Sequence, residues 1–201
     1  MSDQNQRRRA ALQAFESAGA FLRGHFVYTS GRHGADYLEK FRILEEPGVT
    51  VQLAAMIAEH FRALGVQLVA GPTTGGIILA YEVARQLGVD AVYAERGERG
   101  GRVLRRGFAI SPGTQVLVVD DVVTTGGSVA ETQACIAESG GLVVGVGVLA
   151  DRTAGRMKTD VPFFACLSLD FPSYRPEECP LCAAGVPIAP PRGSGKKVAP
   201  V

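Results

Sequence analysis

Apolar residues follow two different patterns along the chain. Continuous apolar runs of the length typical of buried strands lie at 66–70, 91–95, 115–120 and 142–150. Two of the stretches between them, 77–87 and 128–139, carry apolar residues three or four positions apart, which predicts helices. Strands that alternate with helices favour a parallel sheet, so the pattern predicts an α/β fold.

The ends of the chain follow other patterns. A helix is predicted over 6–18, then two short strands around a turn, and then a long helix that begins at Pro47. Beyond Pro172 the chain is rich in proline and glycine, which favours a surface segment. The expected organisation is a single domain with three parts: an amino-terminal segment (1–46), an α/β core (47–172) and a carboxyl-terminal tail (173–201).

Composition and charge narrow the class of protein. With 201 residues and 46% hydrophobic content, the chain can bury one good core. The net charge of +1 gives no reason to expect nucleic acid as a partner, and the Arg7–Arg9 cluster is interpreted as a solvated helix face. No apolar run approaches the roughly 20 residues of a membrane span, and no signal peptide is recognised. We therefore expect a cytoplasmic protein without a membrane partner.

The segment Val116–Ser128, with sequence VLVVDDVVTTGGS, carries most of the candidate chemistry. Its apolar run predicts a strand that places Asp120 and Asp121 at the carboxyl end, where ligands bind in open α/β sheets. The hydroxyl- and glycine-rich turn that follows suits a phosphate at a helix N-terminus, with Ser128 opening the helix and Glu131 completing a capping box. Paired carboxylates suit sugar hydroxyls or hydrated Mg²⁺. This one segment therefore predicts a site for a phosphorylated ribose.

An earlier segment, Val69–Gly76, repeats the same design with the sequence VAGPTTGG. Its Thr73, Thr74 and Gly75 offer a second phosphate site, unless the turn only joins a strand to a helix. Two such units in one sheet can hold phosphate groups at both ends of one ligand. Neither a GxGxxG nor a Walker A sequence occurs, which argues against dinucleotides and ordinary nucleoside triphosphates.

The segment 116–128 resembles the 5-phosphoribosyl-1-pyrophosphate (PRPP) motif of type I phosphoribosyltransferases. The resemblance implies their fold, a central and mostly parallel sheet flanked by helices with a small amino-terminal hood. It also implies that Asp120 and Asp121 hold the ribose hydroxyls or, through water, Mg²⁺, and that the earlier loop cradles pyrophosphate. The implied PRPP-binding residues are Asp120, Asp121, Val122, Val123, Thr124, Thr125, Gly126, Gly127, Ser128, Thr73, Thr74, Gly75 and Arg96.

Two further segments resemble the orotate phosphoribosyltransferases of that family. They are the run 24–33 (GHFVYTSGRH) with the following Asp36-Tyr37-Leu38, and Ala150-Asp151-Arg152 at a strand end. The guanidinium of Arg152 matches planar, anionic orotate, and a surface ion pair with Asp151 or Asp160 is the alternative. The implied orotate-binding residues are Thr29, Tyr37, Thr124 and Arg152. A purine or xanthine phosphoribosyltransferase and a PRPP-sensing regulator without catalysis are the rival functions.

The predicted reaction is the Mg²⁺-dependent synthesis of orotidine 5′-monophosphate for pyrimidine synthesis. Orotate attacks C1 of the ribose as pyrophosphate leaves, through an oxocarbenium-like transition state. The protein need supply no nucleophile. It must hold both reactants in line, stabilise the charge of the leaving group and exclude water.

The sequence departs from the family pattern at three places. Thr29 and Gly75 stand where many relatives carry lysine, and the stretch 95–106 has no Lys or His. It has five arginines instead, and Gly97, Gly100 and Gly101 lie between them. Because the stretch is polar and rich in glycine, we expect a flexible lid that projects from the sheet. The family loop closes over the neighbour's PRPP, which implies a homodimer with Arg99 or Arg102 as the catalytic group of the loop.

The four cysteines do not form a convincing set. Cys135 and Cys166 fall in apolar surroundings and are interpreted as buried thiols. Cys179-Pro-Leu-Cys182 has the spacing of a metal knuckle, but a zinc site needs two more ligands and the chain has no second cysteine pair. A thiol pair without a metal is therefore the favoured interpretation.

Overall fold

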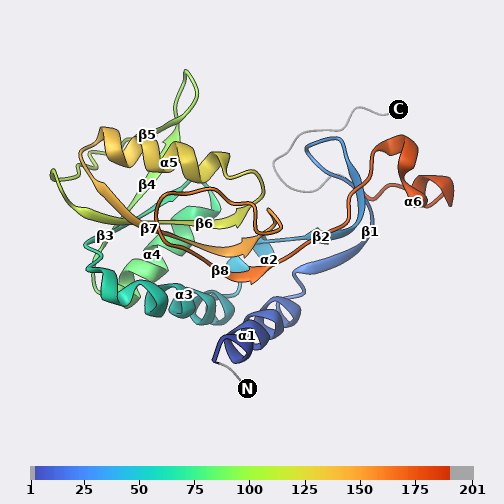
Figure 1. Ribbon diagram of the computed structural model, residues 1–201, viewed down its shortest axis with the longest axis horizontal. Helices are drawn as coiled ribbons and strands as arrows, with labels where there is room; N and C mark the ends of the chain where they lie inside the picture. Colours follow the sequence, from blue (N-terminus) through green and yellow to red (C-terminus); the bar gives the residue numbers. More distant parts are fainter. Residues whose placement is uncertain (1–2, 191–201) are drawn as a thin grey trace.

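A computed structural model of the chain describes residues 3–190, which form an α/β core and a smaller hairpin beside it (Figure 1). Six strands make the core sheet in the order β5-β4-β3-β6-β7-β8. Neighbouring strands are parallel, except that β5 at the edge is antiparallel to β4. The strands are β3 (Leu68–Pro72), β4 (Asp90–Arg96), β5 (Arg102–Leu104), β6 (Gln115–Val123), β7 (Leu142–Asp151) and β8 (Phe163–Ser168).

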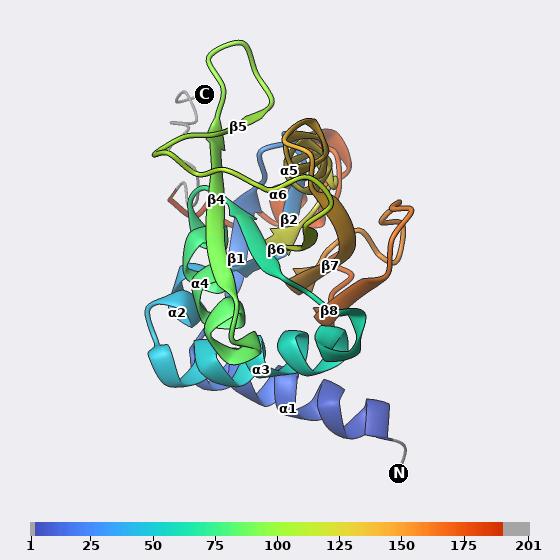
Figure 2. The same cartoon turned by 90° about the vertical axis from the view of Figure 1, so that its left-hand side faces the viewer.

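Helices cover both faces of this sheet (Figures 1 and 2). The helices α3 and α4 pack on one face with α1 beneath α3, and α5 packs on the other. A hydrophobic core lies on each face of the sheet, and strand β6 contributes to both. Leu117 and Val119 pack toward α3 and α4, and Val116 and Val118 pack toward α5. A continuous apolar run is what such two-sided burial requires. The helices are α1 (Asp3–Ser17), α2 (Phe41–Leu44), α3 (Pro47–Phe61), η1 (Arg62–Leu64), α4 (Gly75–Leu87) and α5 (Gly127–Glu138).

The strand order fixes where a ligand can bind. Strands β3 and β6 are neighbours, yet the helices that follow them, α4 and α5, lie on opposite faces of the sheet. The crevice beyond the carboxyl ends of β3 and β6 is therefore the topological switch point, the usual ligand site of open α/β sheets. The two Thr-Thr-Gly-Gly turns of the sequence lie at this point. The predicted type of fold is confirmed.

The stretch 95–106 differs from the predicted loop. Arg102–Leu104 forms β5, whose residues pair with Ala94–Arg96 of β4, so only Gly97–Gly101 remain as a hairpin turn. Three residues are too few to show an alternating pattern, which is why the sequence did not reveal this strand. The hairpin still projects beyond the body of the protein (Figures 1 and 2).

A second, two-stranded antiparallel sheet, which we call the hood, consists of β1 (Phe21–Val27) and β2 (His33–Leu38). The carboxyl-terminal segment runs along it through η2 (Pro176–Glu178) and α6 (Pro180–Ala183). Isolated bridges pair His33 with Tyr174 and His25 with Ile188. The predicted tail therefore packs on the hood as far as the structure describes it, and 191–201 lie outside the described residues. No helix of residues 3–190 has the length and apolar character to cross a membrane.

Candidate active site

Arg102 of β5 joins the two turns at the switch point. Its Nη1 donates a hydrogen bond to Thr73 Oγ1 (3.0 Å) and its Nη2 donates one to Ser128 Oγ (3.0 Å). Its Nε lies 3.5 Å from Glu131 Oε2, and only 10% of the side chain is exposed. A permanent positive charge thus lies between the two turns that the sequence predicted to bind phosphate.

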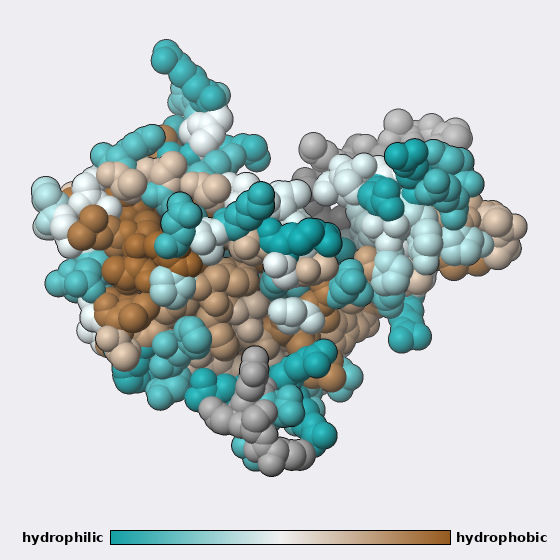
Figure 3. All heavy atoms as spheres, viewed as in Figure 1, coloured by the Kyte–Doolittle hydropathy of each residue, from teal (hydrophilic) through white to brown (hydrophobic). Residues whose placement is uncertain are grey.

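This position corrects the expected role of Arg102. The sequence offered Arg102 as one of two residues that reach a neighbouring subunit, but its side chain is buried in its own chain because strand pairing turns it inward. Arg99 lies exposed in the hairpin turn, and Arg96 lies opposite Arg102 in the β4–β5 ladder. Hydrophilic residues cover the projecting hairpin at the top of Figure 3.

The turn after β6 differs from the prediction in its helix cap. Helix α5 begins at Gly127, with Gly126 as the N-cap in the left-handed region (φ 83°), and no side chain caps it. Ser128 and Glu131 contact Arg102 and do not form a capping box. Thr124 and Thr125 are exposed where the first amides of α5 lie, which suits a phosphate.

The valines that follow the two carboxylates belong to the core. The side chain of Val123 is buried in the hydrophobic cluster on the α5 side of the sheet, and that of Val122 packs against the cluster on the other side. Their backbone still takes part in the site: the Val122 amide donates to Asp121 Oδ1 (2.6 Å), and the Val123 carbonyl accepts from the Arg152 amide (2.8 Å).

Asp120 and Asp121 are both buried at the end of β6, with 6% and 2% exposure, but their surroundings differ. Lys40 Nζ donates to Asp121 Oδ1 (2.9 Å) and lies 2.7 Å from its Oδ2. Asp120 accepts a hydrogen bond from the Asp121 amide (2.8 Å). Burial, and then the charge of Asp121, raise the pKa of Asp120 to about 7. Asp121 is therefore an ion-pair partner, whereas Asp120 is poised to gain charge when a cation or a pair of hydroxyl donors arrives.

Lys40 is a site residue that sequence reasoning missed. It lies just before α2, and its ammonium group reaches Asp121 across 81 positions of the chain. With 35% of its side chain exposed, its charge is also available to a ligand. It approaches the same carboxylate that Gly75 faces, since a Cβ at Gly75 would lie 1.8 Å from Asp121 Oδ2. Lys40 thus supplies positive charge beside Gly75 of the first turn.

Arg152 follows β7 at the same edge of the sheet. Its guanidinium carbon lies 5.2 Å from the ring centroid of Tyr28 and 4.9 Å from that of Phe171, which are cation–π distances. Its Nε is buried and has no hydrogen-bond partner among the described residues. Asp151, the proposed alternative partner, instead accepts from the Thr153 amide (2.7 Å). The arginine is therefore held by two rings, and its charge is not neutralised by Asp151.

The other predicted orotate-binding residues lie in the hood and after β6. Thr29 is exposed in the turn of the hood, Thr124 is exposed after β6, and the ring of Tyr37 packs 5.3 Å from Phe26. Tyr28, which the sequence analysis passed over, is the hood residue that contacts Arg152. Its hydroxyl donates to the Asp36 carbonyl, and burial raises its pKa. No periodicity signals Tyr28 or Phe171, because only the tertiary fold brings them to Arg152.

Comparisons with known proteins agree with this geometry. The phosphoribosyl transferase domain family matches residues 42–175. An orotate phosphoribosyltransferase of Pelotomaculum thermopropionicum is 48% identical over 182 residues, which cover 90% of this chain and 95% of that protein. Another, of Caldanaerobacter subterraneus subsp. tengcongensis, is 46% identical over 92% of this chain and 96% of its own. The crystal structure of orotate phosphoribosyltransferase from Aeropyrum pernix has a TM-score of 0.64 and 28% identity, covering 78% of this chain and 92% of that one.

Proposed function

The chain belongs to the orotate phosphoribosyltransferases of the phosphoribosyl transferase family, and we propose that the crevice between β3 and β6 is where it converts PRPP and orotate to orotidine 5′-monophosphate and pyrophosphate. The observation that carries this assignment is the bridge that Arg102 makes between Thr73 and Ser128. It holds two anion-binding turns at a fixed separation, with the buried Asp120 beside them. The relatives at 46–48% identity favour this function over the purine, xanthine and sensor alternatives.

Each part of PRPP has a matching group in the crevice. The amides and hydroxyls of 124–128 bind the 5-phosphate at the start of α5, and the turn 73–75 with Arg102 binds the pyrophosphate. Asp120 accepts hydrogen bonds from the ribose hydroxyls. The ionised Asp120 also stabilises the positive charge that the ribose gains as its bond to pyrophosphate breaks. Lys40 and Arg102 stabilise the negative charge of the leaving group.

Magnesium is the cofactor we propose for this site. One or two carboxylates together with a ligand rich in phosphate oxygens are what Mg²⁺ binds, usually while keeping several waters. Of the two predicted carboxylates Asp120 fits better, because Lys40 and the Val122 amide already engage Asp121. When bound, the ion would neutralise charge on the pyrophosphate.

Arg152 is proposed to select orotate. Replacing Arg152 with Ala removes a charged hydrogen-bond donor worth about 1.5–3 kcal/mol, so kcat/KM for orotate should fall roughly 10- to 150-fold. PRPP affinity, measured by titration without orotate, should change less than twofold. Arg156→Ala, an exposed arginine of the same loop, is the matched control and should leave both values unchanged. Equal losses for orotate and PRPP in Arg152→Ala would mean a structural arginine.

Gly75 is predicted to be indispensable for PRPP binding. Its substitution by Ala would place a Cβ 1.8 Å from Asp121 Oδ2 and 2.8 Å from its Cγ, so the buried carboxylate must leave its contacts with Lys40 and Val122. We expect kcat/KM for PRPP to fall at least tenfold, on the order of one lost charged hydrogen bond. Gly48→Ala in α3, where nothing lies within 4 Å of the new methyl group, should keep wild-type kinetics. Unaltered kinetics in Gly75→Ala would show that the carboxylate position is unimportant.

A homodimer with a shared site is the proposed assembly. Four exposed apolar side chains lie on α2, α3 and α4, and they are Phe41 (42% exposed), Val51 (40%), Ile78 (43%) and Tyr81 (67%). Three of them border a largely apolar groove of about 350 Å³ between α3 and α4. Such patches commonly mark protein interfaces. Since Arg102 serves its own chain, Arg99 in the projecting turn is the residue we propose to reach the partner's PRPP.

A further inference from the structure

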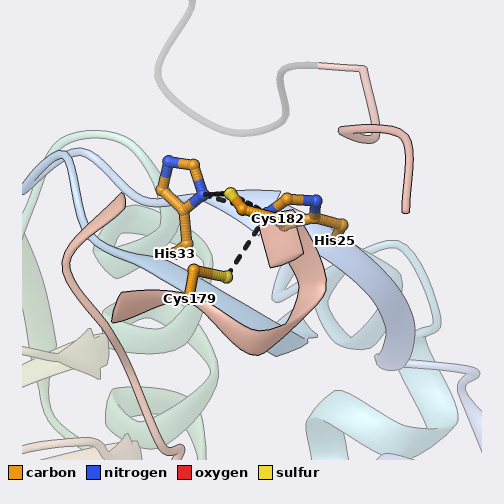
Figure 4. Close-up of side chains that lie close together, drawn as sticks. All are labelled: His25, His33, Cys179 and Cys182. Carbon is orange, nitrogen blue, oxygen red and sulfur yellow. Dashed lines mark hydrogen bonds between the residues drawn. The ribbon is translucent and has the colours of Figure 1, made fainter. Parts of the chain in front are cut away.

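Four metal-binding side chains from distant parts of the sequence meet beside the hood (Figure 4). His25 and His33 come from β1 and β2, and Cys179 and Cys182 come from the start of α6. Their ligand atoms all lie within 4.8 Å of one another. The two missing ligands of the cysteine knuckle are therefore histidines, which the sequence separates from the cysteines by about 150 positions. The sequence argument that the cysteine pair lacks two further ligands is therefore wrong.

The distances between the sulfur and nitrogen atoms match those of a tetrahedral zinc site. Zinc bonds of about 2.3 Å to sulfur and about 2.0–2.1 Å to nitrogen place the two kinds of ligand about 3.5 Å apart at tetrahedral angles. Both sulfurs lie 3.6 Å from His25 Nε2, and Cys182 Sγ lies 3.3 Å from His33 Nδ1. The two nitrogens are 2.9 Å apart. The sulfur–nitrogen distances therefore fit tetrahedral zinc, whereas the two nitrogens lie closer than the roughly 3.3 Å that a tetrahedral angle requires, so the two rings would have to separate slightly to bind the ion.

A hydrogen bond to the backbone also orients the ring of His25. His25 Nδ1 lies 2.7 Å from the Val186 carbonyl oxygen. Because a carbonyl only accepts, Nδ1 carries the proton and Nε2 turns its lone pair toward the two sulfurs. A histidine that donates its second nitrogen to a backbone carbonyl is the usual arrangement around a bound metal. His25, His33 and Cys179 are buried, at 2%, 7% and 2% exposure, which further favours a built site over a chance surface cluster.

We propose that His25, His33, Cys179 and Cys182 bind one structural Zn²⁺ ion. Two thiolates and two neutral imidazoles form a closed set that selects zinc over the oxygen-preferring Mg²⁺ and leaves no position for substrate. Binding releases the two thiol protons, so that the two thiolate charges balance the charge of the ion.

The ion would join the carboxyl-terminal segment to the hood. That segment also carries Ser173, whose hydroxyl accepts from Arg32 Nε (2.9 Å), and Phe171, which contacts Arg152. A zinc link at α6 therefore fixes the chain that leads back to the orotate end of the proposed active site. Its role is to stabilise the fold, because none of the four ligands touches the crevice residues described above.

Metal content of the full-length chain, purified without a polyhistidine tag, tests the proposal. We expect about one zinc per chain in the wild type and in the control Cys135→Ser, whose thiol lies elsewhere in the core. The Cys179→Ser/Cys182→Ser double variant should hold almost none. A strong chelator should lower the unfolding temperature of the wild type and of the control, but not that of the double variant. Equal zinc in all three proteins, or none in the wild type even after titration with Zn²⁺, would overturn the assignment.

Cobalt provides a readout that does not depend on the folding of any variant. When wild-type chain is stripped of metal and loaded with Co²⁺, a site with two thiolates in tetrahedral geometry gives intense visible d–d bands and a thiolate-to-cobalt charge-transfer band. Addition of Zn²⁺ should abolish both, with one equivalent sufficient. Weak bands typical of octahedral cobalt, or no thiolate charge transfer, would contradict the proposed ligand set.

Discussion

Asp120→Asn is expected to inactivate the enzyme while making the fold more stable. The substitution keeps the oxygen that accepts from the Asp121 amide but removes the charge that is proposed to face the ribose. Loss of one preorganised electrostatic group typically costs about 10²–10³-fold, so kcat/KM for PRPP should fall by that amount. The stability should rise because a buried carboxylate next to another carboxylate no longer has to ionise.

The gain in stability has a defined pH dependence. The pKa of Asp120 is about 7 in the folded chain, against an ordinary value of 3.8. Between these values the folded chain keeps a proton that the unfolded chain has released, so the free energy of unfolding falls progressively as the pH rises from about 4 to about 7. Asn cannot ionise, and its advantage should therefore be small near pH 4 and complete above pH 7. The difference between the two pKa values limits the advantage at pH 8 to about 4 kcal/mol, and each kcal/mol should raise the unfolding temperature by roughly 2–4 °C in a chain of this size.

Asp121→Asn provides the matched control, since it should change stability in the opposite direction. Its loss of charge leaves Lys40 without the partner that lies 2.7 Å away. Removing one member of a buried ion pair is destabilising, although the partial exposure of Lys40 reduces the cost. Thermal unfolding of both variants at pH 5 and pH 8 separates the two cases. If both Asn variants melt below the wild type at pH 8, the assigned difference between the two carboxylates is wrong.

The strands and helices of the core could be predicted because the pattern of apolar residues along the chain is enough to identify them. The run Val116–Val119 has to be apolar at every position, since alternate residues face α3 and α4 or α5. Strand ends in a parallel sheet then place Asp120, Thr73 and Arg152 at one edge without further information. The short strand β5 escaped prediction because three residues show no period, and with it the inward position of Arg102.

The contacts that complete the site depend on tertiary structure and leave no local pattern. Lys40 looks like any surface lysine until the fold brings it to Asp121. Nothing in the local sequence distinguishes Tyr28 from its neighbours in the hairpin as the residue that contacts Arg152. Only the tertiary fold places its ring, and that of Phe171, against the guanidinium. The same holds for His25, whose role beside two cysteines requires the tail to fold back on the hood.

The second large effect we predict is recovery of activity from two inactive proteins. Asp120→Asn should disable the site of its own chain, whereas Arg99→Ala should disable the site of its partner if the exposed hairpin turn reaches across a two-fold axis. The two variants are mixed in equal amounts, unfolded and refolded together. About half of the dimers should then be hybrids in which one site is intact and the other carries both changes, so about a quarter of the wild-type activity should return.

The control for this experiment pairs two residues of the same chain's site. When Asp120→Asn is refolded with Arg152→Ala, every hybrid site carries one of the two changes, and no activity should return beyond that of the parents. Native mass spectrometry of both mixtures establishes that hybrids have formed. Recovery with Arg99→Ala but not with Arg152→Ala requires a shared site, because no arrangement with all three residues on one chain restores activity in only the first mixture. If hybrids form and both mixtures stay inactive, Arg99 acts within its own chain, and the projecting hairpin closes over the crevice beneath it.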